Sequence, residues 1–350
     1  MHYTELDTPA LAVDLDVLEN NINTLQAACD SLEIDLRVHT KTHKTPAIAK
    51  MQIEAGAIGI VSQKLGEAEA MVAGGIEDIL VPYNIVGRPK LARLTELVTA
   101  NEQVRLILAA DSATTVDGLS AEASAHGYRQ RVIVEMDAGG HRVGVQSPGE
   151  TLELAQRIDG APGLDFAGVM TYASGDGVKP FLEEVRDLTA KAGLPLGIVS
   201  AGGTGSQEFC KSLGCTETRI GSYAWEGMTR VGKRDDLSPE RCPLRMVVTV
   251  VSTSVPGQVI VDGGMKCFTS YPPIPHGYCL EHPEIFFKGM SVEHGQVDIT
   301  ASTHTFKVGE ILSFIPLHGG MTTNLHDHLY PMRDGLVEGV WEVAGRGRCF

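Results

Sequence analysis

The run Arg37-Val-His-Thr-Lys-Thr-His-Lys-Thr45 is the segment with the clearest potential for covalent chemistry. It places two lysines and two histidines directly ahead of Pro46. Burial and neighbouring cations lower the pKa of a lysine, and a neutral lysine amine adds to an aldehyde as a Schiff base. We therefore predict Lys41 as a covalent anchor, with Lys44 as the competing candidate and a solvated basic loop as the alternative.

Two further side chains could contact a cofactor whose aldehyde is bound to this lysine and whose ring lies nearby. Arg142 follows the segment that begins at Asp137, and its guanidinium could donate to a phenolate oxygen. Tyr172 ends another apolar run and could stack on a ring. A surface salt bridge and an ordinary core tyrosine are the respective alternatives.

The C-terminal part holds a histidine cluster, His318-Gly-Gly-Met-Thr-Thr-Asn-Leu-His326-Asp327-His328. Imidazole and carboxylate groups at this density bind divalent metals or exchange protons near neutral pH. Scattered surface histidines are the alternative. The spacing of His276, His282 and His294 is too wide to indicate a site.

Repeated strand and helix patterns must position these groups. Short apolar runs alternate with helical patterns across residues 16–235, which predicts a TIM (β/α)8 barrel rather than an open doubly wound sheet. The predicted strands are Arg37–Lys41, Ala57–Ser62, Asp78–Tyr83, Val104–Asp111, Arg131–Asp137, Asp165–Tyr172, Leu196–Ala201 and Glu217–Ser222.

Residues 236–350 show a different pattern, with alternating β-branched stretches and little helical periodicity. Strands are expected at Leu244–Ser252, Gly257–Val261, Gln296–Ile299 and Ile311–Pro316. The strand-like segment Pro9–Asp14 has no place in the barrel. We therefore expect a C-terminal all-β domain that also takes up residues 1–15.

Glycine-rich turns follow the last barrel strands, where phosphate sites of such barrels lie. Ser200–Ser206 and Gly221-Ser222 offer backbone N–H groups and hydroxyls, with a helical pattern from Gln207. The segment lacks a Walker ending, and glycine turns are common for conformational reasons alone. A phosphate site there and an amine at strand one together predict pyridoxal 5'-phosphate.

The composition of the chain limits the kinds of molecule that it is expected to bind. The net charge of -15 argues against nucleic acid and anionic membranes, so a small molecule is the expected ligand. The seven cysteines contain no Cys-x-x-Cys pair, which argues against a disulfide framework and a zinc knuckle. We expect a cytoplasmic protein with reduced thiols and no membrane span.

Several motifs together resemble the D-threonine aldolase and D-serine dehydratase-like family of fold-type III, alanine-racemase-like enzymes. They are the lysine run, Asp137-x-Gly-x-His-Arg142-x-Gly144, Ser200-x-Gly-Gly-Thr-Gly, Gly221-Ser222-Tyr223, Val261-Asp-Gly-Gly-Met-Lys266, Glu293-His294-Gly295 and Asn324-Leu-His-Asp327. The resemblance implies pyridoxal phosphate on Lys41 and a homodimer whose active site draws on both subunits. It also implies cofactor contacts from Gln63, Arg142, Tyr172, Ser200, Thr204, Gly221, Ser222 and Tyr223.

The resemblance further implies a divalent cation, such as Mn²⁺, Mg²⁺ or Zn²⁺, on a His-x-Asp or His-x-Cys pair. Here the matching place reads His318-Gly319-Gly320, so the second ligand is missing. His326, Asp327 or His328 could substitute for it. These downstream residues also occur in metal-binding relatives, so their presence here does not indicate a replacement ligand. We therefore expect loss or weakening of the metal site.

The expected reaction is retro-aldol cleavage of a D-3-hydroxy amino acid, of the D-threonine or 3-hydroxy-D-aspartate type, to glycine and an aldehyde. His318 is the candidate base, or the metal ligand that assists it. The alternatives are β-elimination from D-serine or 3-hydroxyaspartate, and then racemisation. A pyridoxal-phosphate homeostasis protein is the non-enzymatic alternative, although it would lack the region after residue 236.

Overall fold

The computed structural model describes residues 1–350 except 173–174, 232, 235–236 and 270–275. The chain divides into two compact units. The β unit contains Met1–Thr24, Thr42–Ile48 and Ser222–Gly347, and the barrel unit contains Leu25–Lys41, Ala49–Gly221 and Arg348–Phe350. The predicted domain boundary between residues 235 and 236 lies outside the described residues.

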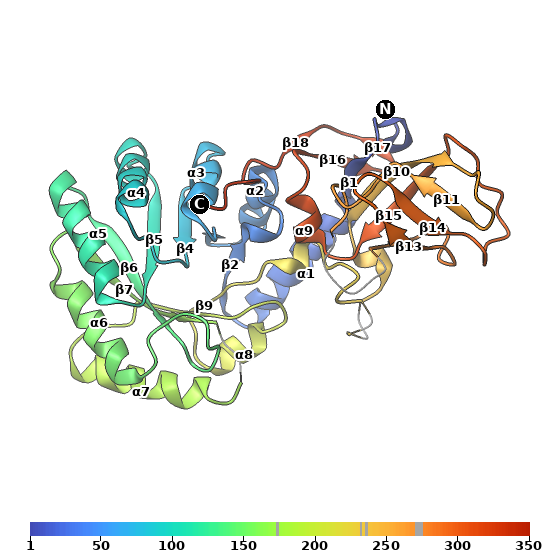
Figure 1. Cartoon of the computed structure of the whole chain (residues 1–350). Coiled ribbons are helices and arrows are strands. Elements are labelled where there is room, and N and C mark those ends of the chain that lie inside the picture. Colours follow the sequence, from blue (N-terminus) through green and yellow to red (C-terminus); the bar gives the residue numbers. More distant parts are fainter. Residues whose placement is uncertain (173–174, 232, 235–236, 270–275) are drawn as a thin grey trace. The chain divides into compact units, whose positions relative to one another are not determined.

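The barrel unit is built on a closed ring of eight parallel strands, as predicted for a TIM barrel. Strand β2 pairs with β3 on one side and with β9 on the other, which closes the ring (Figure 1). The strands are β2 (Asp35–His39), β3 (Gly59–Val61), β4 (Asp78–Val81), β5 (Arg105–Ala110), β6 (Gln130–Met136), β7 (Leu164–Thr171), β8 (Ile198–Ala201) and β9 (Glu217–Thr218). Each one overlaps a strand expected from the sequence.

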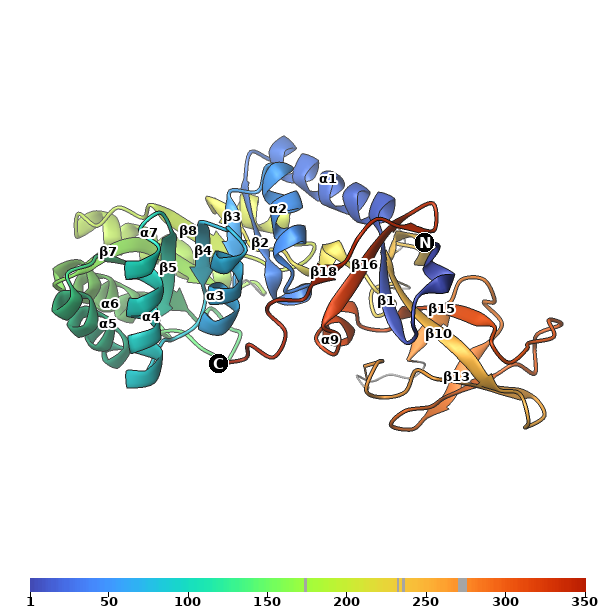
Figure 2. The ribbon, with the colours of Figure 1, turned by 90° about the horizontal axis from the view of Figure 1, so that it is seen from above.

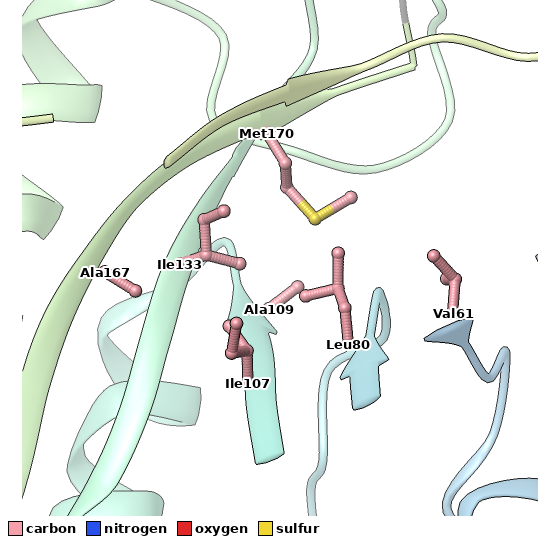
Figure 3. Packing of buried hydrophobic residues seen from close by; sticks show 7 residues of the cluster. All are labelled: Val61, Leu80, Ile107, Ala109, Ile133, Ala167 and Met170. Atoms are coloured by element: carbon pink, nitrogen blue, oxygen red, sulfur yellow. The ribbon is translucent and has the colours of Figure 1, made fainter. Parts of the chain in front are cut away.

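Apolar side chains from neighbouring strands fill part of the barrel (Figure 3). Ile107 and Ala109 project from the same face of β5, because successive side chains of a strand alternate between its two faces. Their buried neighbours in this cluster are Val61, Leu80, Ile133, Ala167 and Met170. The interior is therefore a packed core, and chemistry must take place at the ends of the strands.

Helices alternate with the barrel strands and cover the outside of the ring (Figure 1). The chain's helices are α1 (Leu15–Ser31), α2 (Pro46–Glu54), α3 (Leu65–Ala73), α4 (Arg88–Ala100), α5 (Ala113–His126), α6 (Pro148–Gly160), α7 (Val178–Lys191), α8 (Gln207–Ser212) and α9 (Gly319–Thr323). Ser147 caps α6 by accepting the N–H of Glu150, and Pro148 fits the first turn, where its missing N–H costs nothing. Within the described chain, we find no helix that combines the length and the apolar character needed to cross a bilayer.

The β unit contains a mostly antiparallel sheet (Figure 2). Strand β1 pairs antiparallel with β10 and parallel with β16, so the strand-like segment ahead of the first helix joins the C-terminal strands. The strands are β1 (Ala10–Asp14), β10 (Leu244–Ser252), β11 (Gln258–Val261), β12 (Gly277–Cys279), β13 (Phe286–Met290), β14 (Gly295–Asp298), β15 (Ile311–Pro316), β16 (His328–Arg333), β17 (Leu336–Val337) and β18 (Trp341–Glu342).

Several of these strands are absent from the sequence prediction. β12, β17 and β18 are too short to show an alternating pattern. β16 contains Pro331, which removes a backbone donor and lowers the strand signal. β12 pairs with β15 and β16 pairs with β1, partners that lie far away in the sequence, so tertiary contacts rather than local pattern form these two strands.

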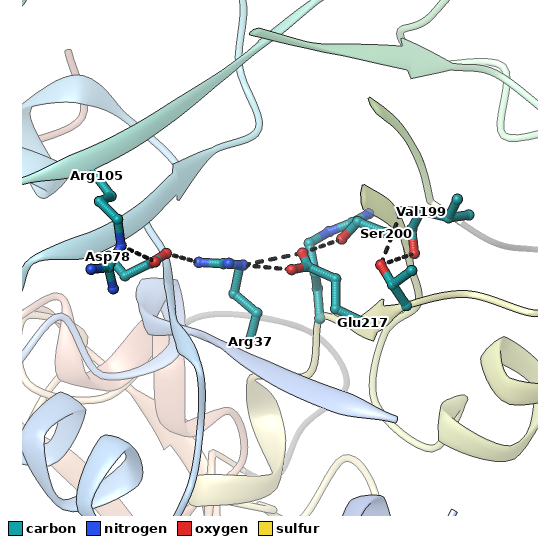
Figure 4. A network of polar contacts seen from close by, with 8 residues as sticks. Arg37, Asp78, Arg105, Val199, Ser200 and Glu217 are labelled. Carbon is teal, nitrogen blue, oxygen red and sulfur yellow. Dashed lines mark hydrogen bonds and ion pairs between the residues drawn. The ribbon is translucent and has the colours of Figure 1, made fainter. Parts of the chain in front are cut away.

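Arg37 is the centre of a buried ionic network at the start of the barrel (Figure 4). Its Nε lies 3.1 and 2.9 Å from the two carboxylate oxygens of Glu217, and its Nη1 bonds Asp78. Arg37 and Glu217 are both almost fully buried. Arg105 donates to the other oxygen of Asp78 at 2.9 Å from a largely exposed position. One arginine therefore balances two carboxylates on different strands.

Removing this buried cation should destabilise the fold strongly. We expect Arg37→Met to lower the free energy of unfolding by about 3 kcal/mol or more, because Glu217 stays buried without its charge partner. The matched control Arg105→Met removes an exposed partner of Asp78 and should cost about 1 kcal/mol or less. Urea unfolding followed by circular dichroism measures both, and equal costs would contradict the buried network.

Candidate active site

Lys41 lies in the 3-10 turn η2 (Thr40–Thr42), directly after strand β2. The buried hydroxyl of Thr40 anchors this turn, since its Oγ1 lies 3.0 Å from the carbonyl of Val61 and 2.7 Å from Oε1 of Glu67. Lys41 itself reaches solvent. The turn therefore holds an accessible amine at the carboxyl end of a barrel strand, where barrel enzymes carry their functional groups.

The surroundings of Lys41 favour its neutral form. Partial burial lowers the pKa of its amine first, and the positive charge of Arg142 lowers it further. Arg219 acts in the same direction, whereas Glu67 opposes the shift. A larger fraction of the amine is then unprotonated near neutral pH than for an ordinary lysine, which is the form that attacks a carbonyl carbon.

Gln63 is held between His39 and Glu67 at the end of β3. Its Oε1 lies 3.0 Å from Nε2 of His39, and its backbone N–H donates to Oε2 of Glu67 at 3.1 Å. Burial lowers the pKa of His39 well below its usual value, and the charge of Lys41 adds to this. His39 is therefore neutral and fixes the amide of Gln63. The sequence does not assign this role to His39 or Glu67.

The loop after β6 wraps around the carboxylate of Asp137. Its Oδ1 accepts the N–H groups of Gly139, Gly140 and His141 at 3.0, 2.6 and 3.0 Å, and Oδ2 accepts that of Arg142 at 3.0 Å. Partial burial raises the pKa of Asp137, but these four donors outweigh it and lower the pKa overall. The ionised Asp137 thus shapes the loop that presents Arg142.

Arg142 and Tyr172 meet at the ends of strands β6 and β7. The guanidinium carbon of Arg142 lies 5.1 Å from the centre of the Tyr172 ring, a cation–π distance. Tyr172 is half exposed. A Cβ on Gly203 would lie 3.4 Å from the same ring. The tyrosine ring therefore lies between the arginine and the glycine-rich loop.

The glycine-rich loop is closed by Ser206, whose Oγ accepts the N–H of Gly203 at 2.8 Å. Gly202 has a φ of +103°, and a Cβ there would lie 2.6 Å from Oγ1 of Thr218. Only glycine fits that position. Thr204 is partly exposed, and Gly205 is exposed at the tip. The tip of the loop is therefore accessible to solvent after β8.

The hydroxyl of Ser200 points into an internal network instead. It donates to Glu217 at 2.6 Å and accepts from Nη1 of Arg219 at 2.7 Å (Figure 4). Nη2 of Arg219 donates to the carbonyl of Thr171 at 2.7 Å. Ser200 is thus placed to position Arg219 rather than to present its hydroxyl to a ligand.

Arg219 and Glu135 form a buried pair of ionisable groups that the sequence prediction missed. Burial raises the pKa of Glu135 to about 7, although Arg219 and Arg142 oppose this. Burial also lowers the pKa of Arg219. A charged residue within the apolar run Gln130–Met136 is the sequence signal that could have drawn attention to Glu135.

The predicted site residues are divided between the two units. Lys41, Gln63, Arg142, Tyr172, Ser200, Thr204 and Gly221 belong to the barrel unit. Gly221 is its last residue before the chain enters the β unit at Ser222 and the buried Tyr223, in the turn η3 (Ser222–Ala224). His318 also belongs to the β unit.

His318 is the N-cap residue of α9, and its Nδ1 accepts the N–H of Met321 at 3.2 Å. Burial lowers the pKa of His318, so the ring is neutral at pH 7. In a neutral ring this contact keeps the proton on Nε2. Taking up a proton or a metal ion through Nε2 therefore requires His318 to release Met321.

Gly320 stands two residues after His318 and offers no side-chain ligand. A Cβ at this position would lie 3.2 Å from the carbonyl oxygen of Thr42, a tight contact. His326 is engaged elsewhere, since its Nε2 lies 2.9 Å from the carbonyl oxygen of Cys267. The turn at α9 therefore provides one imidazole and a closely packed glycine.

Two family models match the chain. The alanine racemase N-terminal domain matches residues 13–228, and a serine dehydratase domain matches residues 243–332. The first covers more than half of the chain and includes every barrel strand.

Known proteins are similar over nearly the whole length. A D-threonine aldolase of an Arthrobacter species is 34% identical, covering 98% of this chain and 93% of the relative. A 3-hydroxy-D-aspartate aldolase of Paracoccus denitrificans is 32% identical, covering 100% and 95%. The crystal structure of a D-threonine aldolase from Filomicrobium marinum superposes with a TM-score of 0.86 at 31% identity, covering 99% and 98%.

Proposed function

Because the chain belongs to the alanine-racemase-like family that includes D-threonine aldolase and 3-hydroxy-D-aspartate aldolase, we propose that it is a pyridoxal-phosphate-dependent lyase of D-3-hydroxy amino acids. It cleaves its substrate to glycine and an aldehyde. The observation that carries the proposal is Lys41, an accessible amine of lowered pKa at the end of a barrel strand, in a chain similar to these aldolases over nearly its full length.

The residues of the barrel unit fit the cofactor. Three buried polar atoms at the carboxyl ends of strands β2, β3 and β7 have no hydrogen-bond partner among the described residues: His39 Nδ1, Ser62 Oγ and Thr171 Oγ1. Buried polar groups ordinarily have a hydrogen-bond partner, so these three atoms are available to the polar groups of a bound cofactor. A Cβ on Gly203 would be in ordinary van der Waals contact with the Tyr172 ring, so the glycine-rich loop lies directly against that ring.

We assign the cofactor contacts as follows. Lys41 would hold the aldehyde carbon, Gln63 and Arg142 would donate to the ring substituents, and Tyr172 would stack on the ring. Thr204, Gly221, Ser222 and Tyr223 would bind the phosphate, while Ser200 positions Arg219. Bound pyridoxal phosphate supplies an electron sink for the electron pair left on the substrate's Cα.

His318 is the residue we propose to remove the proton from the substrate's 3-hydroxyl. Its lowered pKa keeps the imidazole neutral and able to accept a proton. For Nε2 to accept this proton, Nδ1 must carry the ring's own proton and therefore lose the hydrogen bond from the N–H of Met321. That hydrogen bond is worth only about 1 kcal/mol. His318 can therefore act as a base although it also caps α9, because losing this hydrogen bond costs little free energy.

The metal requirement should be weak or absent, because Gly320 provides no second ligand beside His318. We expect dialysis against a chelator to leave the cleavage rate unchanged, and added Mn²⁺ to have little effect on it. Gly320→Asp supplies the carboxylate, although the tight contact with Thr42 must relax to admit it. Loss of activity on chelation, with full recovery on addition of Mn²⁺, would show that the natural chain does depend on a metal ion.

A pH profile tests the assignment of Lys41. Since burial and Arg142 lower its pKa, the rate at which apoprotein adds pyridoxal phosphate should rise with pH and level off below the ordinary lysine value of about 10.4. Arg142→Met removes a positive charge and should move the midpoint to higher pH. The rate is read from the visible absorption of the adduct. An unchanged midpoint in Arg142→Met would contradict the electrostatic cause.

Product analysis tests the reaction. Purified enzyme loaded with cofactor is offered D-threonine, D-3-hydroxyaspartate and D-serine in turn. Glycine with an aldehyde supports the aldolase. Ammonia with a 2-oxo acid identifies a dehydratase instead, and the amino acid with inverted configuration at Cα identifies a racemase.

We also propose a homodimer in the cytoplasm. The family resemblance supports the dimer, and the net charge of -15 disfavours nucleic acid and anionic membranes as partners. Light scattering of the holoenzyme measures the mass in solution, and a monomeric mass with full activity would reject the dimer.

A further inference from the structure

Three metal-binding side chains meet in the β unit at a place remote in sequence from the lysine run and from His318. They are His282, after strand β12, and His304 and Glu310, which precede β15. One donor atom from each lies within 4.8 Å of the other two. Among the residues that the structure describes, this is the one place where three such side chains gather.

The two imidazoles are already arranged around a common point. Their ring centres are 4.8 Å apart with an angle of 31° between the planes. The buried Phe306 packs edge-on against both rings, at 5.1 Å from His282 and 4.7 Å from His304. Nε2 of His304 lies 2.7 Å from Oε1 of Glu310. An apolar floor therefore supports two nitrogen donors and one oxygen donor.

Neighbouring backbone and side-chain groups hold these ligand atoms in place. Oε2 of Glu310 accepts the N–H of Lys307 at 2.8 Å, which turns Oε1 toward His304. Nδ1 of His282 lies 3.6 Å from Oε1 of Glu284, which also accepts a hydrogen bond from Ser302. Metal-binding histidines typically have a carboxylate next to the other ring nitrogen. Glu284 occupies that position for His282 and leaves its Nε2 for an ion.

We propose that His282, His304 and Glu310 bind a divalent cation of the Zn²⁺ type, with water as the fourth ligand. Two imidazoles and one carboxylate are a ligand set that Zn²⁺ accepts. As the ion takes the place between His304 and Glu310, Nε2 of His304 gives up its proton and the ring keeps one proton on Nδ1. Zn²⁺ bonds of about 2.0 to 2.2 Å require the donors to close slightly, and the partly exposed His304 has room to rotate.

Such an ion would join two chain segments that are far apart in sequence. One is the turn after β12, where the N–H of Ile285 donates to the carbonyl of His282 at 3.1 Å. The other is the connection before β15, which ends where the N–H of Gly309 donates to the carbonyl of Val250 at 2.8 Å. The ion's role is to fasten this connection to the turn, independently of the cleavage reaction.

Equilibrium dialysis of the holoenzyme against ZnCl₂ tests the site. All variants carry His318→Ala, so that binding at the turn of α9 does not contribute. His304→Ala and Glu310→Gln should each bind one Zn²⁺ per chain fewer than the parent. The matched control is His126→Ala, because His126 also lies beside a glutamate, with Nδ1 3.5 Å from Oε1 of Glu122, but in no group of three.

Two further readouts keep the result unambiguous. Co²⁺ in place of Zn²⁺ should give a visible spectrum in the parent that His304→Ala and Glu310→Gln lack. The melting temperature of the parent should rise with free Zn²⁺ concentration, and that of both variants should not. Equal stoichiometry in the parent and in both variants, with circular dichroism showing that all are folded, would overturn the proposal.

Discussion

We expect Lys41→Ala to bind no covalent cofactor and to lose activity by on the order of 10⁴-fold or more, the scale on which removal of a covalent catalyst acts in other enzymes. The variant loses the amine that we propose to hold the aldehyde carbon of the cofactor. The visible absorption of the holoenzyme should disappear together with the activity. Absorption measures cofactor attachment separately from turnover, so the two losses can be compared directly.

Lys44→Ala is the matched control, since it lies in the same basic run. Nζ of Lys44 donates to the side-chain oxygen of Asn324 at 2.8 Å, which commits this amine to a structural contact within the β unit. Lys44→Ala should keep the visible absorption. Retention of the band in Lys41→Ala and its loss in Lys44→Ala would reverse the assignment.

We expect His318→Ala to lower kcat by about 10² to 10⁴-fold, the usual contribution of a positioned acid or base. The visible absorption should remain, because Lys41 is intact. The rate of the natural enzyme should fall as the pH drops through the pKa of His318, which burial places below that of an ordinary histidine. His318→Ala should lose this step in the pH profile.

His318 also caps α9, so a conservative variant must separate the chemistry from the structure. Asparagine is a preferred N-cap residue, and His318→Asn should keep the hydrogen bond from Met321 and the stability of the turn. It cannot exchange a proton. We expect His318→Asn to be as inactive as His318→Ala, and recovery of activity in His318→Asn would reduce His318 to a structural cap.

Much of the barrel is predictable from the chain because it is a local pattern repeated. Each of the eight strands is a short apolar run between helical segments, and each run recurs in the structure. The sequence also predicts the glycine-rich turn at Ser200–Ser206. Only the structure shows that Gly202 has a positive φ and lies against Thr218, a conformation and a contact that exclude a side chain.

The supporting groups of the site were harder to predict. Glu67 binds the turn of Lys41 from a helix, and Arg219 binds Ser200 and Thr171 from the end of the last barrel strand. Nothing near these residues in the sequence marks them as partners. Closure of the ring brings them together, since it aligns the carboxyl ends of strands that are distant along the chain.

Lys41 and His282 show what the sequence alone predicts and what only the tertiary structure shows. The types and spacing of residues 37–45 alone predict a reactive lysine, because all the relevant side chains are near neighbours in the chain. The spacing of His282 indicates no site. Only folding brings it within 4.8 Å of His304 and Glu310, because strand pairing in the β unit draws together a turn and a connection that share no local pattern.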